Sequence, residues 1–389
     1  MSLADYGYTD RFRVYENQYP EYIPARVISQ ERGLYTVVCD RGELSAEISG
    51  RVRYTADNAV SFPAAGDFVM LSLPGGEGRA VIHSILPRKS TFVRRAAGSA
   101  CEGQVIAANV DTVFICTSLN GDFNIRRLER YTAAVWDSGA FPVTVLTKAD
   151  LCSNASEKLT EIERALPGTE TVLTSAFNYD TAGLDKYLQK GKTIAFAGSS
   201  GTGKSTLINL LLGEDRFDTA GIDKNDRGRH TTTSRQLVRL PQGAMLIDTP
   251  GMRELGMWHQ AEGIEKTFSD IRELMGQCRF SDCSHTNEPG CAIKSAIASG
   301  ELSKERWKAY LKLESENAYS QDTDSYLAQK EKAAEIVRGK GQNSIAHFLK
   351  QAGQRGKPFA EQLAVFGQRI GKDNGYQSCQ ADRGADFRL

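Results

Sequence analysis

The sequence lacks a long apolar run, an excess of charge of either sign, and a high proline content. No apolar stretch approaches the roughly 18 residues that a membrane span needs. Lys and Arg number 48 and Asp and Glu number 48, so the formal net charge is zero. This balance excludes a strongly basic DNA-coating protein, although not a local basic patch. With 11 Pro and 36 Gly in 389 residues, and with 40% hydrophobic residues, the chain is neither collagen-like nor disordered along its whole length.

The N-terminal residues and the cysteine content indicate the cellular compartment in which the protein is expected. Residues 1–20 lack the basic region and apolar stretch that mark a secretory signal peptide. We therefore expect a cytoplasmic monomer that does not bind membranes. The chain has 8 cysteines, and in a reducing compartment we expect no disulfide framework. Three cysteines crowd between 278 and 291 beside a histidine, and they need another explanation.

Short strands dominate the region from Tyr22 to Pro87. Their spacing is nearly regular, and it indicates either a small closed or half-closed barrel or another small β-domain. The sequence by itself leaves both possibilities open. The expected strands are 25–29, 34–39, 44–49, 68–73 and 80–86.

From about Asn109 onward, strands alternate with helices. This alternation predicts βαβ units, a largely parallel sheet, and ligands bound at the carboxyl ends of its strands. A helical region follows from Ala261 to Leu313, and the chain after Glu314 is charged and rich in Gln and Gly. The expected strands are 111–119, 141–150, 171–176, 192–198 and 244–251, the second and last with polar ends, and the expected helices are 125–136, 155–166, 184–189 and 204–213.

One of the polar strand ends carries a phosphate-loop motif. Residues 198–205 fit G-x-x-x-x-G-K-S/T, with a strand before and a helix after. The glycines let the backbone fold around a phosphate, and the helix N-terminus adds partial positive charge. Lys204 is expected to neutralise the outer phosphates, and Ser205 to bind Mg²⁺. The expected nucleotide contacts are Gly198, Ser199, Ser200, Gly201, Thr202, Gly203, Lys204, Ser205 and Thr206.

A second motif, Thr147-Lys148-Ala149-Asp150, indicates guanine because of its position ahead of the phosphate loop. A solvated loop is the alternative for these residues read alone. Guanine has two adjacent donors, which one carboxylate accepts as a forked, charge-assisted pair. Adenine would leave Asp150 desolvated and unpaired. The stem of Lys148 is placed to cover one face of the base, and Ser175 and Ala176, after the next strand, to offer a backbone N–H to the guanine carbonyl.

A third motif, Asp248-Thr249-Pro250-Gly251, has the pattern D-x-x-G. We expect Asp248 to hold the Mg²⁺ shell through water, and the N–H of Gly251 to sense the terminal phosphate. Between the two phosphate motifs lies 228–233, Gly-Arg-His-Thr-Thr-Thr. We expect one hydroxyl there, assigned to Thr232, to bind Mg²⁺ only while the last phosphate is present. A simple strand start is the alternative for these threonines.

The crowded cysteines give the pattern C-x4-C-x-H-x5-C. Three thiolates and one imidazole make a closed tetrahedral set, which is typical of structural Zn²⁺ and leaves no position for a catalytic water. Buried thiols beside an unrelated histidine are the alternative. The predicted ligands are Cys278, Cys283, His285 and Cys291.

Taken together, these motifs resemble the ribosome small subunit-dependent GTPase A family. The base motif precedes the phosphate loop, which is a circular permutation of the usual GTPase order, and the resemblance covers about Tyr22 to Leu313. It implies a multidomain chain: an N-terminal OB-fold β-barrel, a central permuted α/β P-loop GTPase domain and a C-terminal α-helical zinc-binding domain. The implied division is an arm at 1–20, the barrel at 21–95, the GTPase domain at 96–258, the zinc domain at 259–320 and a charged extension at 321–389.

The resemblance also implies a function in late maturation of the small ribosomal subunit. Its partners would be that subunit and its rRNA, with GTP bound before hydrolysis and GDP after it. In this interpretation GTP orders the switches so that the flanking domains fit a ribosomal surface, and the ribosome then accelerates hydrolysis. A P-loop ATPase or phosphotransferase, or an RNA-binding module with an idle nucleotide site, are the alternatives.

Two residues depart from the motifs of GTPases. Thr147 stands where the family's base motif has Asn; its shorter arm predicts a weakened bond to the phosphate loop and lower nucleotide affinity, with guanine specificity kept by Asp150. Met252 stands where many GTPases have the Gln that orients water, and the family shares an apolar residue there, so intrinsic hydrolysis should be slow. His230 is the candidate to orient or deprotonate the water, and capping or packing of its loop is the alternative.

Overall fold

The computed structural model describes residues 2–31, 33–56, 59–73, 75, 78–95, 103–119, 123–216, 236–248 and 261–318. The chain divides into two units, Met1–Asp324 and Ser325–Leu389, and all the described residues lie in the first. The described helices are too short or too polar to cross a lipid bilayer.

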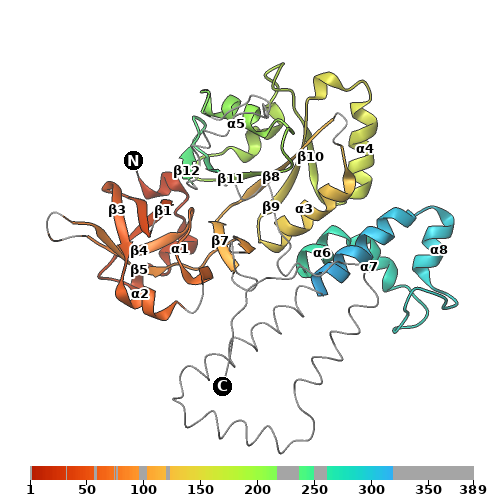
Figure 1. Cartoon of the computed structure of the whole chain (residues 1–389), viewed down its shortest axis with the longest axis horizontal. Coiled ribbons are helices and arrows are strands. Elements are labelled where there is room, and N and C mark those ends of the chain that lie inside the picture. The colour runs from red at the N-terminus through yellow and green to blue at the C-terminus, as the bar shows by residue number, and fades with distance from the viewer. Residues whose placement is uncertain are drawn as a thin grey trace, which may run out of the picture. The chain divides into compact units, whose positions relative to one another are not determined.

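The N-terminal strands form a closed barrel (Figure 1). β1 pairs with β2 and β2 with β3 in antiparallel fashion, β3 pairs in parallel with β5, and β4 bonds to both β5 and β1. The β1–β4 pairing closes the ring, so the barrel interpretation is confirmed. The strands are β1 (Ile23–Glu31), β2 (Leu34–Cys39), β3 (Gly42–Ile48), β4 (Phe68–Ser72) and β5 (Ala80–Ile85), and short helices flank them at α2 (Gly50–Thr55) and η3 (Ala59–Ser61).

The residues before the barrel fold onto it. Leu3, Tyr6 and Phe12 are buried. Arg26 of β1 is also buried and ties three segments together: it donates to the carbonyl of Tyr6 at 2.5 Å, to the carbonyl of Gly66 at 3.2 Å and to the hydroxyl of Thr193 at 2.9 Å. Burial lowers the pKa of Arg26 to about 10. The short elements of this segment are η1 (Leu3–Tyr6), α1 (Asp10–Arg13) and η2 (Glu16–Gln18).

The central strands make a mainly parallel sheet in the order β10-β9-β8-β11-β13-β12. β12, which the sequence analysis did not predict, runs antiparallel to β13, and its Gln236 is paired with Ser29 of β1, so the sheet continues into the barrel. A separate antiparallel ribbon, β6 (Thr91–Arg95) with β7 (Gly103–Ala108), was also not predicted. The sheet strands are β8 (Thr112–Ser118), β9 (Phe141–Thr147), β10 (Glu170–Leu173), β11 (Thr193–Ala197), β12 (Gln236–Arg239) and β13 (Met245–Asp248).

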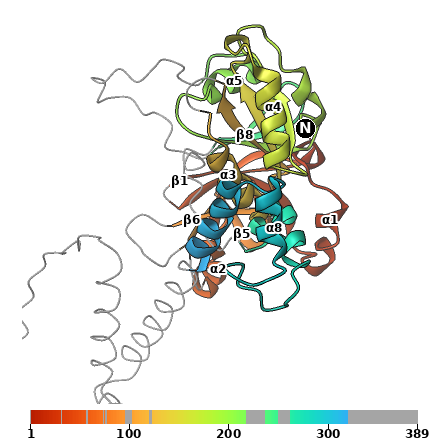
Figure 2. The same ribbon diagram turned by 90° about the vertical axis from the view of Figure 1, so that its right-hand side faces the viewer.

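Helices cover both faces of this sheet, because its strands are apolar on both sides. Val113 and Ile115 of β8 pack in one buried cluster with residues of α3 (Ile125–Asp137) and α4 (Ala155–Ala165). Their neighbours on the strand, Phe114 and Cys116, pack in another cluster with α5 (Lys204–Leu212). Figures 1 and 2 show these helices beside the strands. The short helix predicted at 184–189 is present as η5 (Ala182–Tyr187), which is a 3-10 helix.

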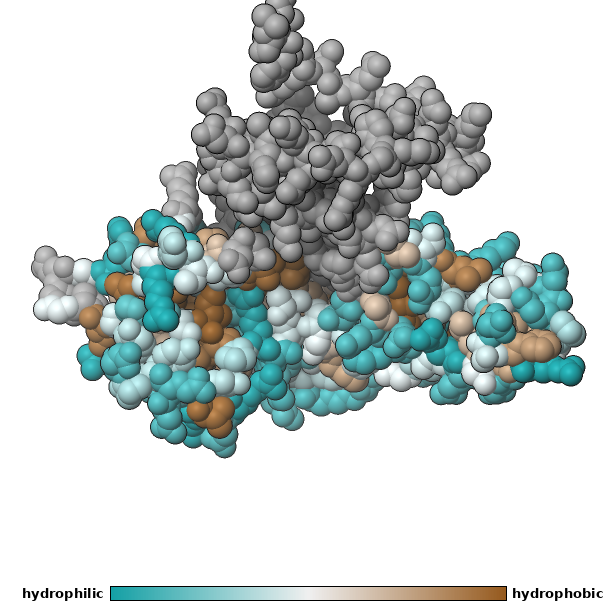
Figure 3. Space-filling view, turned by 90° about the horizontal axis from the view of Figure 1, so that it is seen from below, coloured by the Kyte–Doolittle hydropathy of each residue, from teal (hydrophilic) through white to brown (hydrophobic). Residues whose placement is uncertain are grey.

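A helical segment follows at 261–318 and packs against α3. Its core joins Ala133 of α3 to Ile264, Phe268 and Ile271. A Cβ on Gly263 would collide with the carbonyl of Ala133, so this position requires the smallest residue. In Figure 3 the apolar residues on the face shown form small patches separated by hydrophilic ones. The elements are α6 (Ala261–Thr267), α7 (Ser269–Met275), α8 (Ala292–Ser299) and a last helix at 304–318.

Candidate functional site

The phosphate-loop residues lie between β11 and α5, as predicted. Gly198, Gly201 and Gly203 have φ values of 127°, 79° and 82°, in the region that favours glycine. A Cβ on Gly198 would also collide with the carbonyl of Cys116 on the neighbouring strand. The loop therefore depends on glycine for its backbone angles and for its close approach to β8.

The Lys204 ammonium is folded onto its own loop. Its Nζ donates to the carbonyl of Gly198 at 2.8 Å, to the carbonyl of Ser199, and to the hydroxyl of Thr202 at 3.3 Å. Ser205 and Thr206 follow in the first turn of α5. A phosphate in the loop would have the α5 N-terminus and the Lys204 cation beside it, which are the two attractive elements of an anion site.

The base motif lies directly against this loop. Thr147, at the end of β9, is 5% exposed, and its Oγ1 donates to the carbonyl of Thr202 at 2.6 Å. Lys148 has φ +58°, and its Nζ donates to the carbonyl of Gly201 at 3.0 Å. The link between the two loops, which the shorter arm of threonine put in doubt, is thus formed by the threonine hydroxyl. The lower nucleotide affinity stays a prediction.

Asp150 is exposed and oriented by the next loop. Ser175 is 4% exposed, and its Oγ donates to Oδ1 of Asp150 at 2.6 Å. The N–H of Ala149 donates to the carbonyl of Thr174 at 3.3 Å. One carboxylate oxygen of Asp150 is therefore held by Ser175, and the residue is otherwise open to solvent.

Two features near these loops were missed by the sequence analysis. Phe177 is 82% exposed, Tyr179 is 77% exposed and Leu151 is 71% exposed, so apolar side chains follow the base loops closely. In the sequence, Phe177 and Tyr179 follow the Thr-Ser-Ala motif closely, and Leu151 directly follows the base motif. The second feature is Arg127 of α3, whose Nη1 donates to Oγ of Ser199 in the phosphate loop, and no local pattern marks it.

The remaining candidates of the nucleotide site are only partly described. Asp248 ends β13, beside the end of β11, but its side chain is outside what the structure describes. His230, Thr232 and Gly251 lie outside the described residues. Their roles stay predictions from the sequence.

The four predicted zinc ligands come together after α7. Their ligand atoms all lie within 4.8 Å of one another, and Nδ1 of His285 is 3.5 Å from Sγ of Cys278 and 3.6 Å from Sγ of Cys291. A sulfur and a nitrogen on one tetrahedral zinc are separated by about 3.6 Å, given Zn–S and Zn–N bonds of about 2.3 and 2.05 Å. His285 has φ +61°, and Cys291 is the N-cap residue of α8.

The clustered thiols also affect one another's ionisation. Burial and the neighbouring sulfurs raise the pKa of Cys283 to about 11. The pKa of Cys278 is lowered; burial opposes this change, and hydrogen bonds from the backbone at Ala292 and Ile293 and from the other two thiols produce it. Three thiolates this close repel one another unless a cation lies between them. The donor set and spacing therefore fit a closed structural Zn²⁺ site.

Comparison with known proteins decides the family. A family model described as RsgA GTPase matches residues 85–258. The protein named small ribosomal subunit biogenesis GTPase RsgA 2 from Lactiplantibacillus plantarum is 45% identical over 344 residues, which cover 87% of this chain and 96% of that protein. The chain belongs to the RsgA GTPase family.

Other RsgA relatives agree. The protein named small ribosomal subunit biogenesis GTPase RsgA from Opitutus terrae is 42% identical over 346 residues, covering 85% of this chain and 94% of that protein. The crystal structure of YjeQ from Thermotoga maritima matches with a TM-score of 0.57 and 26% identity over 76% of this chain and 99% of that one. The circularly permuted GTPase YloQ, at 24% identity and a TM-score of 0.56 over 76% of this chain and 95% of that one, has the same fold. The permuted RsgA architecture and the GTP hydrolase class expected from the motifs are therefore confirmed.

Proposed function

We propose that this chain is a GTP hydrolase that acts on the small ribosomal subunit during its late maturation. The observation that carries the nucleotide assignment is the hydrogen bond between Thr147 and Thr202, which joins a carboxylate suited to guanine and a lysine loop suited to phosphates at one edge of the sheet. The names of the RsgA relatives support the ribosomal role. Work on ribosomal subunits implies a cytoplasmic location.

In the proposed site, Asp150 accepts both donors of the guanine edge, with Ser175 holding the other side of the carboxylate. The stem of Lys148 covers one face of the base, and the backbone at Ser175 and Ala176 binds the guanine carbonyl. The glycine backbone and Lys204 bind the phosphates, so Lys204 must give up its bonds to the loop carbonyls when a nucleotide enters.

Ser205, Thr232 and Asp248, the last through water, are the proposed Mg²⁺ ligands. The ion would neutralise charge on the outer phosphates. His230 is proposed to orient or deprotonate the attacking water, and ordering of its loop on the ribosome would speed a slow intrinsic reaction. Zn²⁺, one per chain, would be held by Cys278, Cys283, His285 and Cys291 and would fix the fold of the helical segment.

Co-sedimentation with purified small ribosomal subunits tests the function. Binding should be strong with a non-hydrolysable GTP analogue and weak with GDP, and GTP turnover should rise when subunits are added. Binding that ignores the nucleotide, together with turnover that ignores the subunit, would favour an RNA-binding module with an idle site. Equal binding of ATP and GTP by the free protein would favour an ATPase or phosphotransferase.

A further inference from the structure

α3 begins at the nucleotide site and is held there by a capped N-terminus. The Oδ1 of Asn124, its N-cap residue, accepts a hydrogen bond from the N–H of Arg127 at 3.1 Å. This cap fixes the first turn, where Arg127 is half-buried. From that turn Arg127 donates to Oγ of Ser199, the second residue of the phosphate loop. A guanidinium thus lies against the loop that is to receive a triphosphate, although it belongs to none of the nucleotide motifs.

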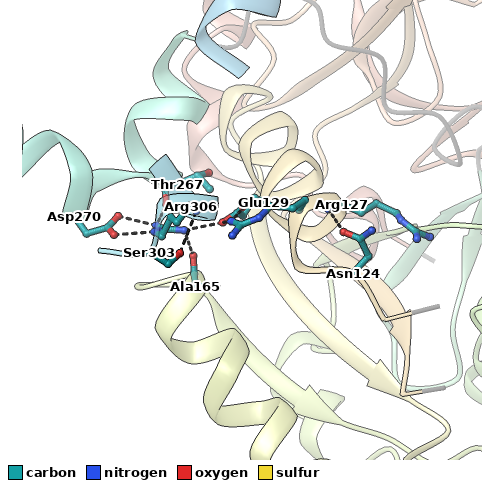
Figure 4. A network of polar contacts seen from close by, with 9 residues as sticks. Asn124, Arg127, Glu129, Ala165, Thr267, Asp270, Ser303 and Arg306 are labelled. Atoms are coloured by element: carbon teal, nitrogen blue, oxygen red, sulfur yellow. Dashed lines mark hydrogen bonds and ion pairs between the residues drawn. The ribbon is translucent and has the colours of Figure 1, made fainter. Parts of the chain in front are cut away.

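On its opposite side, α3 is bound to the helical segment through a buried ion pair between Glu129 and Arg306. Residues 127 and 129 are about 200° apart around a helix of 3.6 residues per turn, so they project from opposite sides. Glu129 is 0% exposed and Arg306, from the last helix at 304–318, is 6% exposed. Nη1 of Arg306 donates to Oε1 of Glu129 at 2.9 Å. Figure 4 shows Arg127 and Arg306 on the two sides of α3.

The contact between Arg306 and Glu129 is held in one geometry, because the Arg306 guanidinium donates hydrogen bonds to residues of several elements. Asp270 of α7 accepts two bonds from its guanidinium, at 2.9 and 2.7 Å. The carbonyls of Ala165 and Thr267 accept at 2.5 and 3.2 Å. Arg126 also donates to both oxygens of Glu129, at 2.7 and 2.8 Å. A buried charge with satisfied partners resists movement, because a shift would leave buried donors and acceptors unpaired.

We infer that Arg127 is a positioning residue of the nucleotide site: it holds the phosphate loop through Ser199, and α3 carries the placement of the helical segment to that loop. A shift of the last helix acts on Arg306, then on Glu129, and through the rigid first turns of α3 on Arg127. This inference rests on the proposed function and adds to it a route by which a partner of the helical segment changes nucleotide affinity.

The first test measures nucleotide affinity and GTP turnover of the full chain. Arg127→Gln should weaken binding of a fluorescent GDP and raise KM by about tenfold, the effect of one hydrogen bond to a charged group. The kcat should change less than twofold, because the loop is needed equally by substrate and transition state. Arg127→Lys should recover part of the affinity. Arg13→Gln is the control, since Arg13 lies on the exposed surface of α1 and pairs there with Asp10.

A double-mutant cycle tests the route through Ser199. Ser199→Ala should weaken binding as Arg127→Gln does, and the double variant should be no worse than either single one. If Arg127→Gln is equally damaging in the Ser199→Ala background, Arg127 acts on the nucleotide directly and the inference is wrong. An unchanged KM in Arg127→Gln would also overturn it.

A second double-mutant cycle tests the coupling through the Arg306–Glu129 ion pair. Arg306→Lys keeps the charge but cannot serve both Glu129 and Asp270, so it should weaken GDP binding about threefold in the parent and not in the Arg127→Gln background. Asp270→Asn is the milder variant if Arg306→Lys fails to fold. Equal effects in both backgrounds would overturn the coupling through α3. A parent chain that binds no guanine nucleotide would contradict the proposed function as well. Normal GTP turnover in the parent, together with an unchanged nucleotide affinity in Arg127→Gln, would contradict only this inference.

Discussion

The hydroxyl of Thr147 donates to the carbonyl oxygen of Thr202 across 2.6 Å, and both residues are buried. This bond links the two loops that are far apart in the sequence and together form the candidate nucleotide site. A threonine performs the linking here although the family's motif uses an asparagine. The hydroxyl of Thr147 therefore takes the place of the asparagine amide, and although its arm is shorter it reaches the phosphate loop.

Removing that hydroxyl should loosen the site. Thr147→Val keeps the shape but leaves the carbonyl of Thr202 buried without this donor, which costs about 1–3 kcal/mol. Guanine nucleotide affinity should fall about tenfold, measured by titration with a fluorescent GDP. Thr147→Ser keeps the hydroxyl and should remain within about threefold of the parent. Equal affinities for the valine and serine variants would show that the bond does not support binding.

Asp150→Asn should change the base that the site accepts. The amide places a donor against the guanine donors, so affinity for GTP should fall at least about 100-fold, the loss of two charge-assisted bonds. Xanthosine triphosphate, which offers an acceptor at that edge, should bind better than GTP. Competition titrations with both nucleotides measure the change. Asp180→Asn is the matched control on the neighbouring loop, and its base preference should stay that of the parent.

The Cys/His cluster predicts a tightly held metal. The purified chain should contain about one zinc per molecule by elemental analysis. Cys283→Ser should lose it, and a strong chelator should unfold the helical segment in the parent, seen as a loss of helical circular dichroism. Cys152→Ser removes a thiol outside the cluster and should keep the zinc. A parent chain that folds fully without metal would argue against a structural site.

His83 should make the barrel less stable in acid. Its ring stacks on Tyr22 with centroids 4.1 Å apart, and its Nε2 is 2.9 Å from Oγ of Ser72. Burial lowers the pKa of His83, although Glu21 opposes this. The unfolded chain therefore takes up the proton first, so stability is complete above the ordinary value of about 6.5 and falls as the pH drops toward the folded pKa.

Urea unfolding at pH 7.5 and 5.5 measures that loss. The parent should unfold at lower urea at pH 5.5, and His83→Asn, which does not titrate, should show a smaller difference between the two conditions. A difference as large in the variant as in the parent would assign the acid sensitivity to other groups.

The elements and motifs that could be predicted are those that depend on neighbours in the sequence. The alternation of 80–86 reflects one buried strand face, and the apolar run at 68–73 reflects a strand that is buried on both faces. The spacing of Cys278 to Cys291 reflects one metal-sized cluster. The strand β12 was not predicted, because its two adjacent apolar residues, Leu237 and Val238, form neither an alternating pattern nor an apolar run. The Glu129–Arg306 ion pair joins residues 177 positions apart, and nothing local to either residue indicates the other.

The same limit applies to Thr147. Side-chain length alone put the bond to the phosphate loop in doubt, although the bond is formed. The answer depends on how closely β9 approaches that loop, and this separation is set by tertiary packing rather than by the motif.

The pairing of Ser29 with Gln236 makes the barrel and the central sheet one continuous hydrogen-bonded ladder. Gln236 stands four positions after the candidate switch residue Thr232 in the chain. A partner that binds the barrel and displaces β1 would therefore also displace Gln236. The barrel would in this way transmit the movement of a bound partner to the chain next to the candidate switch residue.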